Sequence, residues 1–451
     1  MEQKRLSTKE TFTIGLMMFA LFLGAGNMIF PPSLGQSAGT NVWIAIIGFL
    51  LTGVGLPLLG VIAVGLTGGS IKELAGRVHP GFAIIFSTVM YLAIGPFFGI
   101  PRTGTVAYEI GVTPFLPDTL NENGIPLLVY TIVFFGITFW FSLNPTKLVD
   151  RIGKVLTPIL LVVIGLIVIK GIVNPMGSIS IPKGDYASNP FFTGFINGYL
   201  TMDAIAALVF GIVVINAVKS KGVTDKKEIA KSTTKAGLIA VSGLALVYLS
   251  LAYIGATSRN VIGSTDNGGA ILTGAADILY GQFGLMLLSV AITFACLTTS
   301  IGLVTSCGEF FKKIMPNISY NLIIGIICIF SAAIGNIGLT QLINFTLPVL
   351  IGIYPLAIAL IVYSFFHRQF GGYREVYIGG LLGAGMVSIF DALKQMNVNI
   401  TAVTDLMSTY LPLYNQGVGW IVPSLILAVI GYIIGKGREH TLDHADNPNN
   451  A

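Results

Sequence analysis

Charged residues are scarce in this chain of 451 residues. Asp, Glu, Lys and Arg make up 10% of it, against about 25% in an average soluble domain. Hydrophobic residues make up 54%, and no charged residue occurs from Thr11 to Ile71 or from Ile314 to His367. Each of these two runs is long enough for two helical crossings of a bilayer, at about 20 residues per crossing. The composition therefore excludes a soluble globular protein and predicts an all-α polytopic membrane protein that contacts the lipid bilayer.

Cysteine is also rare, and its three positions carry no pattern. Cys296, Cys307 and Cys328 all fall in apolar segments, so neither a disulfide framework nor a Cys-x-x-Cys metal site is predicted. No Gly-x-x-x-x-Gly-Lys-Ser/Thr motif is present, so ATP is not expected to be the energy source. The sequence therefore predicts no cofactor and no transition metal.

The four histidines lie away from the middle of every apolar segment. His79 and His367 fall at predicted membrane edges, and His440 and His444 lie in the polar C-terminal tail. Intramembrane hydrolysis or acyl transfer usually needs a histidine within the membrane. We therefore expect no enzyme and no catalytic residues.

Twelve apolar segments are candidates for membrane crossings. They centre on residues 11–35, 42–66, 82–108, 125–142, 155–173, 191–217, 236–256, 284–308, 320–336, 341–365, 376–394 and 417–435. Of the 25 Lys and Arg residues, twenty precede the first segment, follow the last one or occupy every second loop, whereas only four occupy the other loops. Because basic loops stay in the cytoplasm, both termini are expected to be cytoplasmic in a multi-pass protein of the cell membrane. The net charge of +5 resides in these loops, so it indicates no nucleic-acid partner.

The first apolar segment contains a stretch that should interrupt its helix, LFLGAGNMIFPP from Leu21 to Pro32. Counted from Thr11 at 1.5 Å per residue, Gly24 and Asn27 fall about 20–24 Å along the segment, within a hydrocarbon core about 30 Å thick. Backbone freed from a helix at this depth survives only where protein covers it or where it lines a polar cavity. The alternative is that the glycines merely form a close helix-packing surface, with Pro31 and Pro32 ending the helix.

The sixth apolar segment carries a lone charge, Asp203, about 12 residues from its start. A carboxylate near the bilayer midplane is costly, and its default interpretation is functional; a structural role within a network of helix polar groups is the alternative. The loop charges orient the first and sixth segments in opposite directions. Two antiparallel interrupted helices, five segments apart, are typical of an inverted five-plus-five repeat.

The eighth segment places hydroxyl groups at mid-membrane depth, at Thr298, Thr299 and Ser300. Hydroxyl and carbonyl oxygens suit small hard cations. Serine and threonine also hold membrane helices together, so helix packing is the alternative. In the third segment, Arg102 and Glu109 share one helix face about 10 Å apart. We expect Arg102 to snorkel to the interface, to form a structural pair with Glu109, or to have a role in a gate or in the substrate vestibule.

Three motifs in chain order, LFLGAGNMIFPPSLGQSAG, GPFFGIPRTGTVAYE and NGYLTMDAIAALVFG, resemble the branched-chain amino acid:cation symporters, the BrnQ-type carriers of the LIVCS family. The resemblance covers essentially the whole chain. It implies import of leucine, isoleucine and valine, driven by a sodium or proton gradient, and a fold similar to the LeuT-type inverted repeat. The implied organisation is a cytoplasmic N-tail (1–10), a first five-helix repeat (11–173), a second, inverted repeat (191–365), two additional helices (376–435) and a cytoplasmic C-tail (436–451).

The resemblance also implies two adjoining sites. An amino-acid substrate would be bound at the two helix breaks, its carboxylate on amides of the first and its ammonium on carbonyls of the sixth, by Gly24, Ala25, Gly26, Asn27, Tyr199, Thr201, Met202 and Asp203. A cation, Na⁺ if the carrier is sodium-coupled, would be bound between the first and eighth segments by carbonyls and hydroxyls of Ala20, Leu23, Cys296, Thr299 and Ser300, with Thr298 replacing a hydroxyl if the register slips by one.

Two alternatives share these physical features. One is a LeuT-type carrier for another small amino acid or a nucleobase. The other is a channel or a transporter-like sensor, which would need no coupling site. Carbonyl and hydroxyl oxygens favour sodium as the coupling ion, whereas Asp203 permits a proton. The sequence pattern carries no signal for oligomeric state or for preference among the three amino acids.

Overall fold

The computed structural model describes residues 5–67, 69–121, 124–143 and 148–445. Within these ranges every regular element is helical. The predicted tails 1–10 and 436–451 therefore lie partly outside the described residues.

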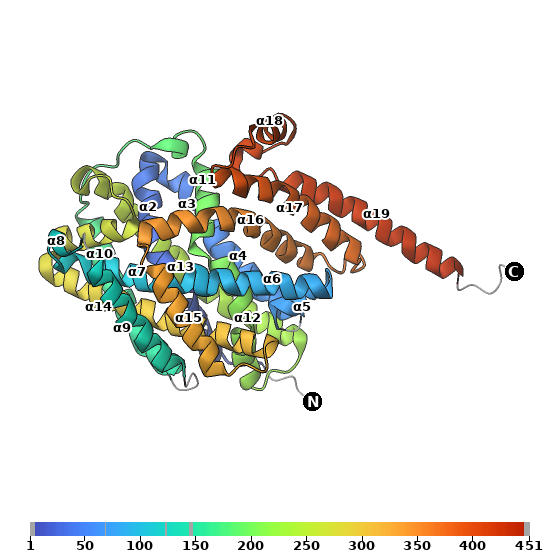
Figure 1. The fold of residues 1–451 in the computed structure, drawn as a ribbon, viewed down its shortest axis with the longest axis horizontal. Helices are drawn as coiled ribbons and strands as arrows, with labels where there is room; N and C mark the ends of the chain where they lie inside the picture. Colours follow the sequence, from blue (N-terminus) through green and yellow to red (C-terminus); the bar gives the residue numbers. More distant parts are fainter. Residues whose placement is uncertain (1–4, 68, 122–123, 144–147, 446–451) are drawn as a thin grey trace.

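The helices follow one another along the chain, and a longer connection that contains only the turn η5 joins α10 to α11 (Figure 1). The α-helices are α1 (Thr8–Phe22), α2 (Ala25–Ala38), α3 (Val42–Leu50), α4 (Leu56–Thr67), α5 (Ile71–Gly76), α6 (Pro80–Leu92), α7 (Gly99–Gly111), α8 (Asp118–Asn121), α9 (Ile125–Ser142), α10 (Leu148–Val173), α11 (Pro190–Asn197), α12 (Asp203–Ser220), α13 (Lys226–Ile262), α14 (Gly268–Ile314), α15 (Tyr320–Gly335), α16 (Leu339–Phe365), α17 (Arg374–Gln395), α18 (Thr401–Tyr410) and α19 (Ile421–Ala445). Short 3₁₀ or π turns are η1 (Gly39–Asn41), η2 (Leu51–Gly55), η3 (Ala93–Phe97), η4 (Thr113–Phe115), η5 (Gly184–Tyr186), η6 (Gly198–Thr201) and η7 (Tyr414–Gln416).

Nine helical stretches in the described part of the chain are long and apolar enough to cross a membrane, with Ala25–Thr67 counted as one of them. Leu161–Val173 and Tyr320–Gly335 are shorter apolar helices. The protein is thus a multi-pass helical membrane protein, and the figure of twelve crossings stays a prediction.

The first predicted segment is broken where its glycines indicated. Helix α1 ends at Phe22, and α2 begins at Ala25 after Gly24, whose backbone is extended (φ −108°, ψ −171°). The prolines do not end the helix, since α2 continues through Pro31 and Pro32 to Ala38.

The sixth predicted segment is also interrupted. Helix α11 passes into the turn η6, and Met202 then adopts a left-handed conformation (φ 63°) before α12 begins. In Figure 1, α2 and α11 lie on one side of the molecule and α12 lies on the other side, where α1 packs against it. The chain therefore runs through its two breaks in opposite directions.

Helix α2 is held very close to its neighbours. A Cβ atom added at Gly35 would lie 1.9 Å from the carbonyl oxygen of Ala252 on α13, and one at Gly268 of α14 would lie 1.7 Å from that of Ile29. These approaches bring backbone against backbone, which is typical of small residues at membrane helix interfaces. The second half of the first broken helix, α2, is thereby fixed against α13 and α14.

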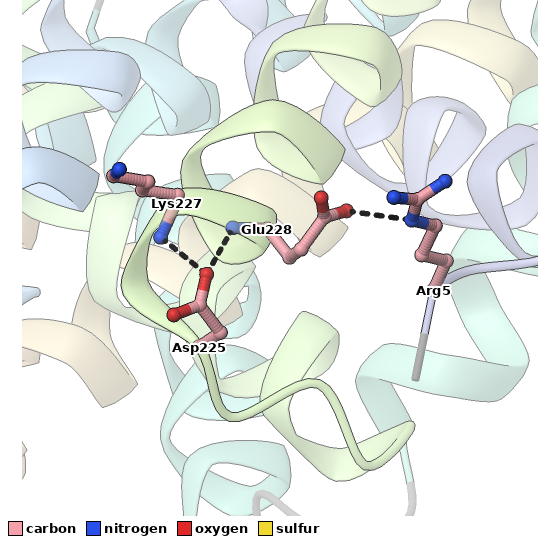
Figure 2. A network of polar contacts seen from close by, with 4 residues as sticks. All are labelled: Arg5, Asp225, Lys227 and Glu228. Atoms are coloured by element: carbon pink, nitrogen blue, oxygen red, sulfur yellow. Dashed lines mark hydrogen bonds and ion pairs between the residues drawn. The ribbon is translucent and has the colours of Figure 1, made fainter. Parts of the chain in front are cut away.

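The start of α13 is capped and touches the N-terminal segment (Figure 2). The Asp225 carboxylate accepts hydrogen bonds from the backbone N–H groups of Lys227 and Glu228, both at 3.0 Å. Arg5 lies 3.7 Å from the Glu228 carboxylate. Because Arg5 is largely exposed, this pair stabilises the fold by at most about 1 kcal/mol. Helices α17 and α19 pack on each other, and α19 projects from the rest of the molecule (Figure 1).

Candidate functional site at the two helix breaks

A cavity lies where the two breaks meet. Residues of α1, α2, η3, α7, η6, α12 and α14, together with residues of both breaks, line it. The lining includes Gly24, Ala25, Gly26, Asn27, Arg102, Thr201, Met202, Asp203 and Thr299, with apolar side chains from Leu21, Phe22, Ile94, Phe210 and Leu303. Most of the predicted substrate residues are thus brought together.

Four helix ends converge on this cavity. Helices α2 and α12 begin there, and their first-turn N–H groups have no acceptor within their own helix. Helix α1 and the turn η6 end there and present carbonyl oxygens. The N-terminal ends carry partial positive charge and the C-terminal ends partial negative charge. A molecule with one carboxylate and one ammonium group matches both kinds of end.

Asp203 is the first residue of α12 and is buried. Its Oδ2 atom accepts hydrogen bonds from Asn27 Nδ2 at 2.7 Å and from the Tyr248 hydroxyl at 2.5 Å. Asn27 Nδ2 also contacts the Tyr248 hydroxyl, and the Gly24 N–H donates to Asn27 Oδ1 at 3.0 Å. The carboxylate therefore joins both breaks and α13 in one polar network.

Arg102 is 5% exposed and reaches across the cavity from α7. Its Nη1 and Nη2 atoms donate to the carbonyl oxygens of Leu200 at 2.5 Å and Thr201 at 3.1 Å. These carbonyls belong to the sixth-segment break, so the side chain does not snorkel to the interface.

Glu109 lies elsewhere and does not pair with Arg102. It accepts a hydrogen bond from Asn267 Nδ2 at 3.2 Å, and Asn267 caps the start of α14. The expected pairing of Arg102 with Glu109 is therefore wrong. The two residues are about 10 Å apart along the helix, and each side chain bonds to a different part of the chain, Arg102 to the sixth-segment break and Glu109 to Asn267.

Two of the predicted cation residues, Thr299 and Ser300, face different neighbours. Thr299 lines the cavity, and a Cβ atom at Gly24 would lie 3.7 Å from its hydroxyl oxygen. Ser300 is fully buried and accepts a hydrogen bond from the Thr138 hydroxyl of α9 at 3.3 Å. Cys296 is buried one turn before Thr299. Ala20 and Leu23 fall at the end of α1, where helix carbonyls lack partners within the helix.

Two contacts at the site were not predicted from the sequence. Tyr248 lies within an ordinary apolar stretch of α13, and only the need of a buried tyrosine hydroxyl for a partner marks it. The ring of Tyr199 stacks on that of Tyr354 of α16, with centroids 4.3 Å apart. Tyr199 thus packs the break of the sixth segment against α16, and its backbone carbonyl accepts from Met202.

The arrangement of two broken, oppositely running helices around a central cavity defines a LeuT-type membrane carrier fold. Solved structures bear this out. The chain is similar to Mhp1, a nucleobase-cation-symport-1 family transporter, in a closed conformation with bromovinylhydantoin bound (TM-score 0.58, 16% identity, 93% of this chain and 91% of that one). It is also similar to MhsT in complex with L-phenylalanine (TM-score 0.55, 16% identity, 96% and 98%).

The chain belongs to the family described as branched-chain amino acid transport protein, which matches residues 7–438. It is 53% identical to the branched-chain amino acid permease BraB of Bacillus subtilis (strain 168) over 429 residues, 95% of this chain and 96% of that one. It is 39% identical to the branched-chain amino acid permease BrnQ of Escherichia coli (strain K12) over 442 residues, 97% and 98%. The family is one of transporters and not of enzymes, which confirms the resemblance found in the sequence.

Proposed function

We propose that this protein imports leucine, isoleucine and valine across the cell membrane by alternating access, in symport with Na⁺ or H⁺. The observation that carries the proposal is the convergence of four helix ends on a cavity with apolar walls, in a chain of the branched-chain amino acid transport family. Relatives named as branched-chain amino acid permeases support the same substrate class. The organisation into two inverted five-helix repeats and cytoplasmic tails is part of the proposal.

The substrate carboxylate is bound by the first-turn amides of α2, from Ala25 to Asn27, where the helix end favours an anion. The ammonium group is met by the carbonyls of η6, with Asp203 close by on α12. The aliphatic side chain contacts apolar residues of the cavity wall, such as Phe22, Phe210 and Leu303. Such a wall distinguishes one methylene by only about 1–3 kcal/mol, so overlapping affinity for the three amino acids is expected.

The coupling cation binds between the end of α1 and the cavity face of α14. Thr299 supplies a hydroxyl oxygen beside Gly24, and the carbonyls of Ala20, Leu23 and Cys296 supply the remaining oxygens. Occupancy of this position orders the first break and thereby completes the carboxylate site. If the coupling ion is a proton, Asp203 carries it, and Thr299 then serves helix packing.

Uptake of radiolabelled leucine into proteoliposomes tests the proposal. A sodium gradient and a pH gradient are imposed in turn, with an ionophore-collapsed gradient as the control. Accumulation driven by either gradient, and inhibited by excess isoleucine or valine but not by a nucleobase, supports the proposed function. Leucine flux that is independent of both the sodium gradient and the pH gradient would indicate a channel. Inhibition by a nucleobase alone would indicate a carrier for another substrate.

A further inference from the structure

The guanidinium group of Arg102 occupies the space between the two breaks. On one side it donates to the carbonyls of Leu200 and Thr201. On the other side it lies against the first turn of α2, since a Cβ atom added at Gly26 would lie 2.8 Å from Nη2 and 3.0 Å from Cζ. Any side chain at Gly26 would therefore collide with the guanidinium group.

The partners of this buried cation are incomplete. Its Nε atom has no hydrogen-bond partner among the described residues, although buried donors are normally paired. Cζ lies 5.3 Å from the centroid of the Phe30 ring, a weak contribution to holding the charge. The guanidinium group also faces the N-terminal end of α2, whose partial positive charge opposes a cation. The guanidinium group thus keeps a donor that is unpaired within the described part of the chain and lies beside a positive helix end, and an anion at that helix end would interact with both the guanidinium group and the helix.

The carbonyls that hold the guanidinium group are those that the proposed function assigns to the substrate ammonium. A cation already tethered to the protein satisfies them when no substrate is bound, and a substrate ammonium must displace it. The displaced group is next to the α2 amides, where the substrate carboxylate arrives. Guanidinium groups bind carboxylates in a bidentate manner.

We propose that Arg102 is a tethered substitute for the substrate ammonium in the empty carrier and a ligand of the substrate carboxylate in the loaded carrier. The inference rests on the proposed function and extends it to selectivity. An amine without a carboxylate cannot complete the exchange, because the displaced guanidinium would lie against the positive end of α2 and would share with the amine the single carboxylate of the described cavity lining, Asp203. The carrier therefore requires both charged groups of an α-amino acid and excludes aliphatic amines.

The test measures binding to purified protein in detergent, with leucine, 3-methylbutylamine and 4-methylpentanoate as the three probes. The amine has leucine's aliphatic chain and nitrogen without the carboxylate, and the acid lacks the nitrogen. Wild type is expected to bind leucine and to exclude the amine. Arg102→Gln is expected to bind leucine about 10- to 100-fold more weakly, as loss of a charge-assisted contact implies, and to acquire amine binding.

Lys170→Gln is the matched control. Lys170 also donates to a backbone carbonyl, that of Leu279, but it lies on α10 away from the cavity lining. Its removal should leave the ratio of leucine to amine affinity unchanged. Arg102→Lys keeps the charge but not the bidentate geometry, so it should weaken leucine binding while still excluding the amine. If the glutamine variant fails to fold, the lysine variant decides the matter.

The outcomes separate the two proposals. Unchanged leucine affinity in both Arg102 variants, or amine exclusion that persists in folded Arg102→Gln, would overturn the role of Arg102 while wild-type leucine binding upholds the proposed function. Absence of leucine binding and uptake in the wild type would overturn the proposed function and this inference with it.

Discussion

Asn27 on α2 donates a 2.7 Å hydrogen bond to Asp203 on α12, and this bond joins the two broken helices across the cavity. Both residues are almost fully buried. The same Asn27 side chain accepts from the Gly24 N–H at 3.0 Å, so one amide group fixes the backbone of the first break and the carboxylate at the second. The Asn27 side chain thus links the backbone of the first break to the carboxylate of the second.

Asp203→Asn should abolish gradient-driven leucine uptake without loss of protein from the membrane. The substitution keeps the size of the side chain but removes the only carboxylate in the cavity lining described here, and with it the charge that faces a substrate ammonium or carries a proton. Asp391→Asn, which alters a carboxylate on α17 outside that lining, is the control and should retain uptake. Wild-type uptake by the Asp203 variant would contradict the site assignment.

Tyr248→Phe should destabilise the protein through its contact with Asp203. The substitution removes a hydroxyl that donates to the carboxylate at 2.5 Å and leaves a buried acceptor short of a donor. A double-mutant cycle with Asp203→Ala, which removes the acceptor, measured by thermal unfolding in detergent, should give a coupling of about 1–2 kcal/mol, the upper range for hydrogen bonds between membrane helices. Additive effects of the two substitutions would show that the bond contributes nothing to stability.

Thr299→Ala should raise the sodium concentration that gives half-maximal uptake, if sodium is the coupling ion. Its hydroxyl lies beside Gly24 at the first break. The hydroxyls of Thr298 and Thr299 both donate to the Ala295 carbonyl, at 2.8 and 3.0 Å, but only Thr299 of the two lines the cavity. Thr298→Ala is therefore the matched control. Ser300→Ala should lower stability more than sodium affinity, because Ser300 contacts Thr138. Equal sodium dependence in wild type and Thr299→Ala would remove Thr299 from the cation site.

The difference between Thr299 and Ser300 illustrates where sequence reasoning stops. Glycine and proline at 24–32 and the lone charge of Asp203 are readable because each is costly inside a membrane, and both mark the breaks. Successive residues of a helix, however, point about 100° apart. Which hydroxyl faces the cavity therefore depends on the rotation of α14 against α9 and α1, which the local pattern does not contain.

The hydrogen-bond partners of Arg102 could not be predicted from the sequence for a related reason. They are backbone carbonyls of Leu200 and Thr201, and a main-chain atom leaves no mark in the sequence when it accepts a bond from a residue about a hundred positions away. The helical fold could be predicted, since hydropathy determines which segments form apolar helices. The pairing of polar groups across helices required the structure.

Gly35→Ala should destabilise the protein markedly. The added methyl group would lie 1.9 Å from the carbonyl oxygen of Ala252, so α2 and α13 must separate. Overpacking costs about 1–3 kcal/mol, and collision with backbone places this variant at the upper end. Gly136→Ala, in a helix position with nothing within 4 Å of the new Cβ atom, should be neutral. Unfolding temperatures in detergent measure both, and equal temperatures would contradict the close approach.

Acidification should loosen the contact between the α5–α6 connection and the start of α17 through His367. The His367 ring is 3.0 Å from the Tyr377 hydroxyl, to which Arg77 also donates at 3.1 Å. Burial and then the positive charges of Arg77 and Arg368 lower the pKa of His367 below its usual 6.5. The neutral ring is therefore favoured in the folded protein, and its contribution to stability is present above pH 6.5 and is lost as the pH falls through the lowered pKa.

The unfolding temperature of the wild type should accordingly fall between pH 7.5 and about pH 5, the range around the ordinary histidine pKa. His367→Gln cannot acquire a charge, so its unfolding temperature should fall less over the same range. His79→Gln is the control, because His79 caps α6 by accepting from the Gly81 N–H at 3.0 Å and faces no arginine in the described contacts. An identical decline in wild type and His367→Gln would assign the acid sensitivity to other groups.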